Sequence, residues 1–274
     1  MVRPEKHPDK RLPPGCEQVP VGLTDVEKLT GIVAGCKAII YCAGSVRGRS
    51  SADFAYANID GVQAMLDALQ GSGTTPPMLL LSSLAASRPK LSDYAYSKYA
   101  GEQLLCNKAH YPWTILRPPA VYGPGDREML PLLKMIRRGL LAHAGPVDQR
   151  LSFLHVDDLT SAMISWLSSW ENCLHETYAI DDGKHTGYDW NEIGGAVSDK
   201  RFRVLKVPDV VLKSAAGSNL FFSKILGYSP MLSPGKVREL IQTEWLCDNR
   251  AFSAATGWKP RLDLKQGTRL LFKA

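Results

Sequence analysis

Short apolar runs alternate with amphipathic stretches along the chain as far as about Gly183. Most of these runs are continuous, which is typical of strands that are buried on both faces of a parallel sheet. The expected strands are Glu17–Val21, Lys37–Cys42, Met78–Ser82, Trp113–Arg117, Leu151–His155, Glu176–Ile180 and Phe202–Val207. The expected helices are Asp25–Ala34, Ala52–Leu69, Tyr94–Ala109, Leu130–Arg138, Leu159–Ser168 and Trp190–Val197. The pattern predicts an α/β fold, with a parallel sheet covered by helices.

The regular alternation weakens after Gly183. The stretch Ser214–Pro234 is rich in Ser, Gly, Phe and Leu, and prolines interrupt it. We therefore expect a large sheet-containing domain over residues 1–182 and a smaller, partly helical C-terminal lobe over residues 183–274. Residues 125–145 are expected to contribute to this lobe, which would lie over the carboxyl ends of the strands and face the substrate.

Composition narrows the class of protein. The longest apolar stretches fall far short of the roughly 20 residues that span a bilayer, so no membrane partner is expected, and no secretory signal is visible. The 274 residues include six cysteines without a C-x-x-C pair, which favours free thiols in the cytoplasm and no metal site. The net charge of +6 is scattered. It suits a phosphorylated small molecule as well as a nucleic acid, and without interleaved aromatic residues no nucleic-acid partner is expected.

A tyrosine and a lysine in the run Tyr94-Ala-Tyr-Ser-Lys98 are the strongest candidates for chemistry. Positions i and i+4 share one face of a helix, so the phenol and the ammonium would lie side by side. The positive charge is expected to lower the pKa of Tyr94, which suits a general acid/base. The alternative is a packed tyrosine beside a solvated lysine.

Two hydroxyl groups follow the buried strand that precedes this helix, in Leu79-Leu-Leu-Ser-Ser83. Ligands of parallel sheets bind at the carboxyl ends of the strands, where a serine can donate a hydrogen bond to the oxygen that Tyr94 protonates. The alternative is an ordinary turn at the end of a strand, where serine is common.

Three segments together resemble the extended short-chain dehydrogenase/reductases of the NAD-dependent epimerase/dehydratase family. They are Leu79–Ala86, Tyr94–Lys98 and Leu116–Gly125, in the same order and spacing. The resemblance runs from Val2 to about Gly183 and implies a Rossmann-like, dinucleotide-binding domain. It makes Tyr94 the acid/base, Ser83 its partner and Lys98 the ligand of the nicotinamide ribose. Asn58 would support the proton relay, and its alternative is plain helix packing.

The resemblance also implies a set of cofactor contacts. Asp25 would contact the adenine amino group, and its alternative is an N-cap for the following helix. The other expected contacts are Cys42, Ala43, Gly44, Ser82, Lys98, Pro118, Pro119, Ala120 and Val121. Arg3 stands where NAD-binding proteins carry an acidic residue, and an arginine there accommodates the 2′-phosphate of NADP. We therefore expect NADP rather than NAD.

Two features depart from the family. No glycine precedes Gly15, so the G-x-x-G-x-x-G turn is missing, together with the first strand and helix of the domain. A misassigned start codon would explain this absence, and a short chain that binds dinucleotide poorly is the alternative. The Ser83–Tyr94 connection is also short for a sugar-nucleotide epimerase, which leaves a smaller or more hydrophobic carbonyl substrate open beside a nucleotide sugar.

The sequence thus predicts an NAD(P)-dependent oxidoreductase, epimerase or dehydratase that transfers a hydride at a secondary alcohol or ketone carbon. The missing glycine turn keeps one alternative open, a non-catalytic nucleotide-binding or assembly member of the same family. A homodimer formed through the helix that carries Tyr94 is a further expectation.

Overall fold

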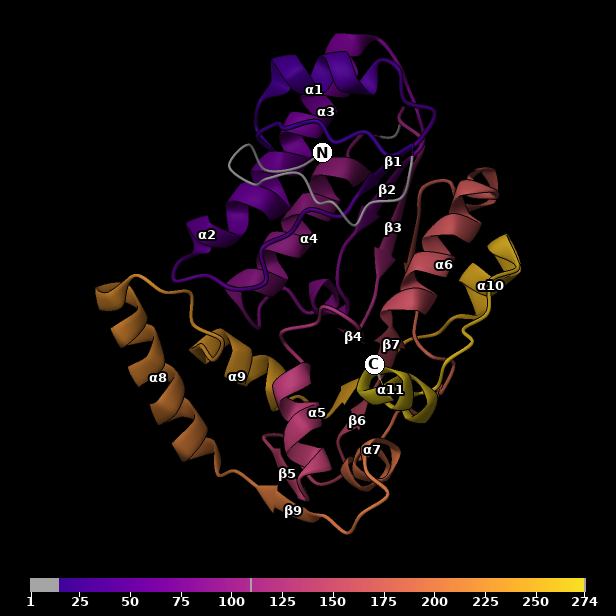
Figure 1. Cartoon of the computed structure of the whole chain (residues 1–274). Helices are drawn as coiled ribbons and strands as arrows, with labels where there is room; N and C mark the ends of the chain where they lie inside the picture. Colours follow the sequence, from indigo (N-terminus) through magenta and orange to yellow (C-terminus); the bar gives the residue numbers. More distant parts are fainter. Residues whose placement is uncertain (1–14, 109, 274) are drawn as a thin grey trace.

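The computed structural model describes residues 15–108 and 110–273. Within them, a central sheet has four parallel strands in the order β1-β2-β3-β8 (Figure 1). Their bounds are β1 Ile39–Tyr41, β2 Met78–Leu81, β3 Trp113–Arg117 and β8 Glu176–Ala179. Met78 of β2 pairs with Ile39 on one side and with Trp113 on the other. The predicted α/β fold with a parallel sheet is confirmed.

Two layers of helices cover the faces of this sheet. On one face lie α1 Val26–Val33, α3 Gly61–Ser72 and α4 Asp93–Cys106, and on the other α6 Val156–Leu167 and α10 Arg250–Thr256. Consecutive residues of β3 point into different layers, since Ile115 belongs to the first core cluster and Leu116 to the second. Both are fully buried. The continuous apolar runs of the sequence thus reflect strands that are covered on both sides.

A second group of elements lies below the carboxyl edge of the sheet in Figure 1. Its helices are α5 Leu130–Arg137, α7 Trp190–Val197, α8 Asp209–Leu226, α9 Pro234–Leu240 and α11 Leu264–Lys273. Its strands form the parallel pairs β4–β7, β5–β9 and β6–β10, with bounds β4 Ala120–Tyr122, β5 Leu140–His143, β6 Arg150–Leu151, β7 Phe153–His155, β9 Arg203–Lys206 and β10 Glu244–Trp245. A third core cluster joins Leu133 and Ile136 to Ile193 and Leu264. Residues near 125–145 therefore pack with the C-terminal part of the chain, while the division into two domains stays a prediction.

Two expected elements differ from the structure. Residues Glu17–Val21 form no strand, and the burial of Val21 in the first core cluster explains their apolar pattern. The single helix expected over Ala52–Leu69 is divided into α2 Ser51–Ala55, the π-helical turn η1 Tyr56–Asp60 and α3. Periodicity does not register such a turn, because every residue of the stretch remains helical.

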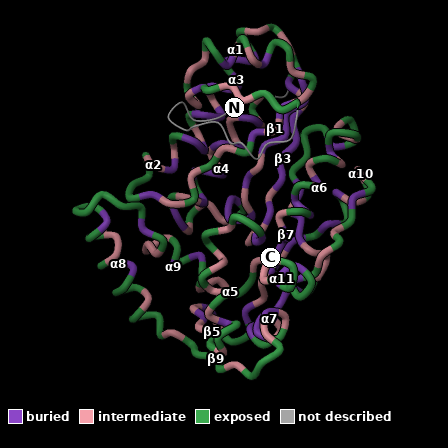
Figure 2. The backbone as a smooth tube through the Cα atoms, in the orientation of Figure 1, coloured by how far each residue is buried: buried purple, intermediate pink, exposed green. Residues whose placement is uncertain are grey.

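Helix α8 packs loosely against the rest of the chain, and Figure 2 shows most of it exposed. Val210 and Leu226 keep 75% and 70% of their surface accessible, and only Ala216 and Ser223 of the helix are buried. Within residues 15–108 and 110–273, no helix has the length and the apolar character needed to cross a bilayer.

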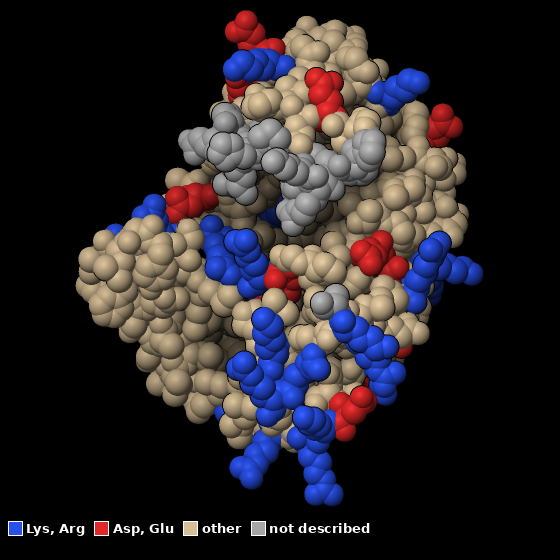
Figure 3. All heavy atoms as spheres, viewed as in Figure 1, with Lys and Arg blue, Asp and Glu red and all other residues tan. Residues whose placement is uncertain are grey.

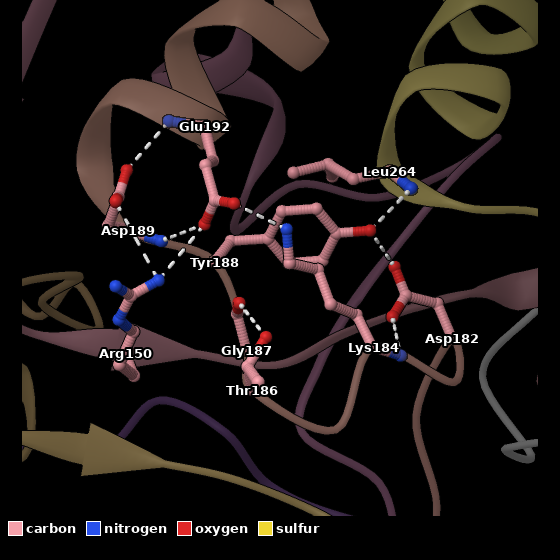
Figure 4. Close-up of polar contacts among 9 residues, drawn as sticks. All are labelled: Arg150, Asp182, Lys184, Thr186, Gly187, Tyr188, Asp189, Glu192 and Leu264. Carbon is pink, nitrogen blue, oxygen red and sulfur yellow. Dashed lines mark hydrogen bonds and ion pairs between the residues drawn. The ribbon is translucent and has the colours of Figure 1, made fainter.

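A polar network joins α7 and α11 to the loop after β8 (Figure 4). The Tyr188 hydroxyl donates to Oδ2 of Asp182 at 2.6 Å and accepts from the backbone N–H of Leu264 at 3.3 Å. Nζ of Lys184 donates to Glu192 at 2.6 Å, and Arg150 donates to the same carboxylate at 3.1 Å. The network fixes the first residue of α11 to the loop that follows β8.

This network makes the stability of the fold depend on pH. Burial, the largest cause, raises the pKa of Asp182 from 3.8 to about 6. A raised pKa in the folded state adds stability that is fully present below pH 3.8 and is lost as pH rises through about 6. In urea unfolding at a series of pH values, we expect the Asp182→Asn variant to lose this component. The exposed Asp60→Asn variant serves as a control and should keep the wild-type slope, and equal slopes for all three proteins would contradict the prediction.

Candidate functional site

The residues expected to bind cofactor follow three neighbouring strands. Cys42, Ala43 and Gly44 come after β1, Ser82 comes after β2, and Pro118–Val121 come after β3. Because parallel strands end at one edge of a sheet, these segments lie together there. Val121 also lines a pocket with Gly123–Asp126 and Val156. The structure thus brings the expected segments to one edge of the sheet, which faces the second group of elements described above.

Tyr94 lies in the first turn of α4, beside Ser83. Ser92 caps the helix by accepting from the Ala95 N–H at 2.9 Å, and this cap places Tyr94 at the start of the helix. The side chain of Ser83 interacts with the Tyr94 phenol and lowers its pKa. Ser83 also accepts from the Ala85 N–H at 3.2 Å and begins the 3-10 helix η2 Leu84–Ser87. Ser83 is therefore both a turn residue and the partner of the tyrosine.

The pKa of Tyr94 moves in the opposite direction from the one expected. Burial raises it to about 12, and the hydrogen bond from Ser83 only partly offsets this rise. The negative charges of Glu239 and Glu128, two residues of the C-terminal elements, raise it further. The expected lowering of the Tyr94 pKa is wrong here, because burial raises the pKa and Lys98 is not among the groups that shift it. The phenol of Tyr94 is consequently protonated at neutral pH.

Lys98 lies one turn along α4 from Tyr94, and its amine points toward the edge of the sheet. Its Nζ donates to the carbonyl of Leu81 at 3.0 Å. Burial lowers the pKa of Lys98 to about 8, although the charge of Glu102 acts in the opposite direction. A Cβ atom at Gly44 would lie 3.0 Å from this Nζ, so the backbone after β1 can pass the amine only as glycine without displacing it.

Asn58 completes this cluster from the π-helical turn η1. Its Oδ1 accepts from the Ser45 N–H at 3.1 Å, and its Nδ2 donates to the Ser45 carbonyl at 3.1 Å and to the Ser97 hydroxyl at 2.9 Å. The side chain is 2% exposed. Asn58 therefore fixes the loop after β1 to helix α4, and π-turns in helices occur frequently at functional sites. Its role in a proton relay stays a prediction.

Ser82 has a buried hydroxyl for which the described residues provide no hydrogen-bond partner. A buried hydroxyl without a partner costs free energy, so a polar ligand at this edge would satisfy it. Together with the Lys98 amine, which the backbone at Gly44 approaches closely, this hydroxyl fits the ribose and carboxamide groups of a nicotinamide cofactor.

Asp25 and Arg3 are the two residues expected to contact the adenosine part of the cofactor. Asp25 caps α1 by accepting from the Lys28 N–H at 3.3 Å and pairs with the Lys28 ammonium at 3.1 Å, so the alternative of an N-cap is confirmed. Its contact with adenine stays a prediction. Arg3 lies outside the described residues.

A buried ion pair behind the site was missed from the sequence. Glu102 is 1% exposed, and its Oε1 accepts from Nε of Arg117 at 2.9 Å in a two-point pair. This pair fixes α4 to the end of β3, with Glu102 one turn beyond Lys98. The spacing of Tyr94, Lys98 and Glu102 on one helix face was a signal that could have suggested it.

The parallel sheet, its helix layers and the residues at its carboxyl edge are those of a Rossmann-fold, nucleotide-dependent oxidoreductase or epimerase. Comparison with known proteins agrees. The family described as NAD dependent epimerase/dehydratase family matches residues 3–180. The ceramide reductase of Caulobacter vibrioides is 32% identical over 220 residues, which cover 79% of this chain and 68% of that protein. The chain belongs to the NAD dependent epimerase/dehydratase family.

Solved structures show the same fold at lower identity. RMD from Pseudomonas aeruginosa, complexed with NADPH, has a TM-score of 0.66 at 19% identity and covers 96% of this chain and 88% of its own. UDP-glucose 4-epimerase from Thermotoga maritima, with UDP-glucose, has a TM-score of 0.67 at 19% identity, with 92% and 82% covered. These two structures share the overall fold of this chain.

Proposed function

We propose that this protein is an NADPH-dependent reductase that converts a ketone group of a ceramide-like lipid to a secondary alcohol. The observation that carries the proposal is the cluster at the carboxyl edge of the sheet, where Ser83 begins η2 just after β2 and Tyr94 lies in the first turn of α4. One turn further along α4, Lys98 donates from its Nζ to the carbonyl of Leu81, the last residue of β2. The similarity to a protein named ceramide reductase supports the direction and the substrate class.

The side chains divide the chemistry between them. Ser83 donates a hydrogen bond to the ketone oxygen and orients it, and Tyr94 gives its proton to the same oxygen as negative charge develops there. The phenol of Tyr94 is protonated at neutral pH, so it has a proton to give to this oxygen. Lys98 holds the nicotinamide ribose through its ammonium. When bound, NADPH would supply the hydride to the carbonyl carbon.

The cofactor proposal rests on the residues at the edge of the sheet. Gly44, Ser82 and the segment Pro118–Val121 would surround the nicotinamide and its ribose. The choice of NADP over NAD depends on Arg3, whose guanidinium suits a 2′-phosphate. Relatives with the same fold carry NADPH in one case and NAD in others, so this choice needs a direct measurement.

The substrate proposal rests on the short connection between Ser83 and Tyr94 and on the C-terminal elements. The connection itself consists of η2 and a short loop, which favours a smaller or more apolar substrate than a nucleotide sugar. Glu128 and Glu239 act on Tyr94 from residues 125–145 and 183–274, so both segments of the proposed substrate-facing lobe approach the reacting oxygen. A nucleotide sugar is the second substrate to be tested.

Cofactor titration followed by turnover tests the proposal. We expect NADPH to bind more tightly than NADH in a fluorescence titration, and to be consumed with a ceramide analogue oxidised to the ketone but not with a UDP-sugar. Gly44→Ala should weaken NADPH binding roughly tenfold, equivalent to about 1.4 kcal/mol. Gly31→Ala is the control, because a Cβ at Gly31 meets open space.

The possible results separate the enzyme from its alternative. Binding of neither nucleotide, or binding without any turnover, would favour a non-catalytic member of the family. Turnover of the UDP-sugar instead of the lipid ketone would keep the site and reject the substrate.

A further inference from the structure

Helix α8 presents a broad uncharged face to solvent. At 100° per residue, the two buried residues Ala216 and Ser223 mark the inner face of the helix. Four large apolar side chains outside this inner face, Phe221, Phe222, Ile225 and Leu226, are 52–70% exposed, and Val210 and Val211 near the start of the helix are 75% and 55% exposed. Monomeric proteins rarely expose contiguous apolar patches of this kind without a function.

The charges around this face are mostly positive. Residues 201–226 contain five basic side chains, Arg201, Arg203, Lys206, Lys213 and Lys224, and one acidic side chain, Asp209. The two lysines of α8 fall together on one flank, between its outer and inner faces. Figure 3 shows the surface over α8 without charged atoms, with Lys and Arg side chains gathered beside it over α5.

The helix is also connected to the candidate site. Lys224 lines a small pocket with Arg49, Ser50 and Asp53 at the start of α2. Phe54, the residue after Asp53, places its ring 6.2 Å from the ring of Tyr94. Helix α9, which packs against α8, binds the loop before Tyr94: Nε of Arg238 donates to the Leu91 carbonyl at 2.6 Å, and Ser92 bonds to Glu239.

We infer that the outer face of α8 docks on an anionic membrane surface and holds the candidate site against the lipid that carries its substrate. An apolar helix face flanked by lysines lies in the interface of a bilayer, and the basic residues attract anionic headgroups. A second copy of the chain fits less well, because a two-fold contact through this face would bring the same positive charges together. The expectation of no membrane partner came from the absence of a spanning segment and does not bear on a helix that lies on the surface.

The inference builds on the lipid substrate of the proposed function, yet vesicle binding is independent of turnover. We expect the full chain to sediment with vesicles of phosphatidylglycerol and phosphatidylcholine, and far less with phosphatidylcholine alone. The double variant Phe221→Ser with Ile225→Ser should bind the anionic vesicles roughly tenfold more weakly or worse, and added salt should weaken wild-type binding.

Two control variants make the result specific. Ile164→Ser removes an apolar side chain on α6 that is 60% exposed, and it should bind vesicles like the wild type. Tyr94→Phe should lose turnover and keep vesicle binding, so failure of the chemistry and failure of docking are distinguishable. The inference is overturned by wild-type binding of the double variant, by equal binding to both kinds of vesicle, or by a dimer in solution that the double variant abolishes.

Discussion

Replacing Tyr94 with phenylalanine is expected to lower the turnover number for ketone reduction by about 10²- to 10⁴-fold, the usual contribution of a positioned general acid. The variant loses only the hydroxyl, so the ring keeps its place 6.2 Å from the ring of Phe54 and helix α4 keeps its Ser92 cap. NADPH binding should change little, because Lys98 and Gly44 are untouched. Steady-state kinetics beside a fluorescence titration measure both quantities.

Tyr96→Phe provides the matched control for this experiment. Tyr96 is two residues further along α4 and 57% exposed, so it lies on the outer side of the same helix. Its variant should have the kinetic constants of the wild type. If Tyr94→Phe also turned over at close to the wild-type rate, the assignment of Tyr94 as the proton donor would be wrong.

The ion pair between Arg117 and Glu102 should give the largest effect on stability. Replacing Arg117 with methionine leaves the Glu102 carboxylate buried without its partner, and such losses lower the free energy of unfolding by about 3–5 kcal/mol. Chemical denaturation followed by circular dichroism measures the change. The same variant should also disturb the position of Lys98, which lies one turn from Glu102 on α4.

A double variant distinguishes loss of the pair from loss of arginine packing. Arg117→Met combined with Glu102→Gln removes the buried charge and should recover most of the lost stability. Arg250→Met breaks the exposed pair with Asp248 and should have no measurable effect. No loss of stability on replacing Arg117 alone would contradict the view that this pair holds α4 on the sheet.

The central sheet was predictable because buried parallel strands leave continuous apolar runs. Trp113–Arg117 was predicted with the bounds that β3 has, and Met78–Ser82 exceeded β2 by one residue. The strands β4, β5 and β10 were missed, since each has only two to four residues and pairs with a single partner. Helix α8 was expected only as part of a loosely helical lobe. Sequence patterns identify a surface helix by a polar face toward solvent, and the exposed face of α8 is apolar.

The candidate site was predictable where the signal was local and was missed where it came from tertiary packing. Residues Tyr94 and Lys98 share a helix face, and Ser83 ends a strand, so their spacing alone brings them near one another. The direction of the Tyr94 pKa was mispredicted because burial of the phenol and the nearby charges of Glu239 and Glu128 arise from tertiary packing. Nothing in the sequence around Arg117 indicates which acidic residue it meets.

The π-helical turn at Tyr56–Asp60 has a consequence for how this protein tolerates changes in length. A π turn holds one residue more than an α turn, so losing one residue there would restore regular α-helix while α2 and α3 keep nearly the same relative orientation. Losing one residue from the regular part of α3 would instead rotate the two ends of that helix by about 100° relative to each other. Deletion of Asn58 itself would remove the hydrogen bonds that join the loop after β1 to α4, while every strand of the sheet stayed in place.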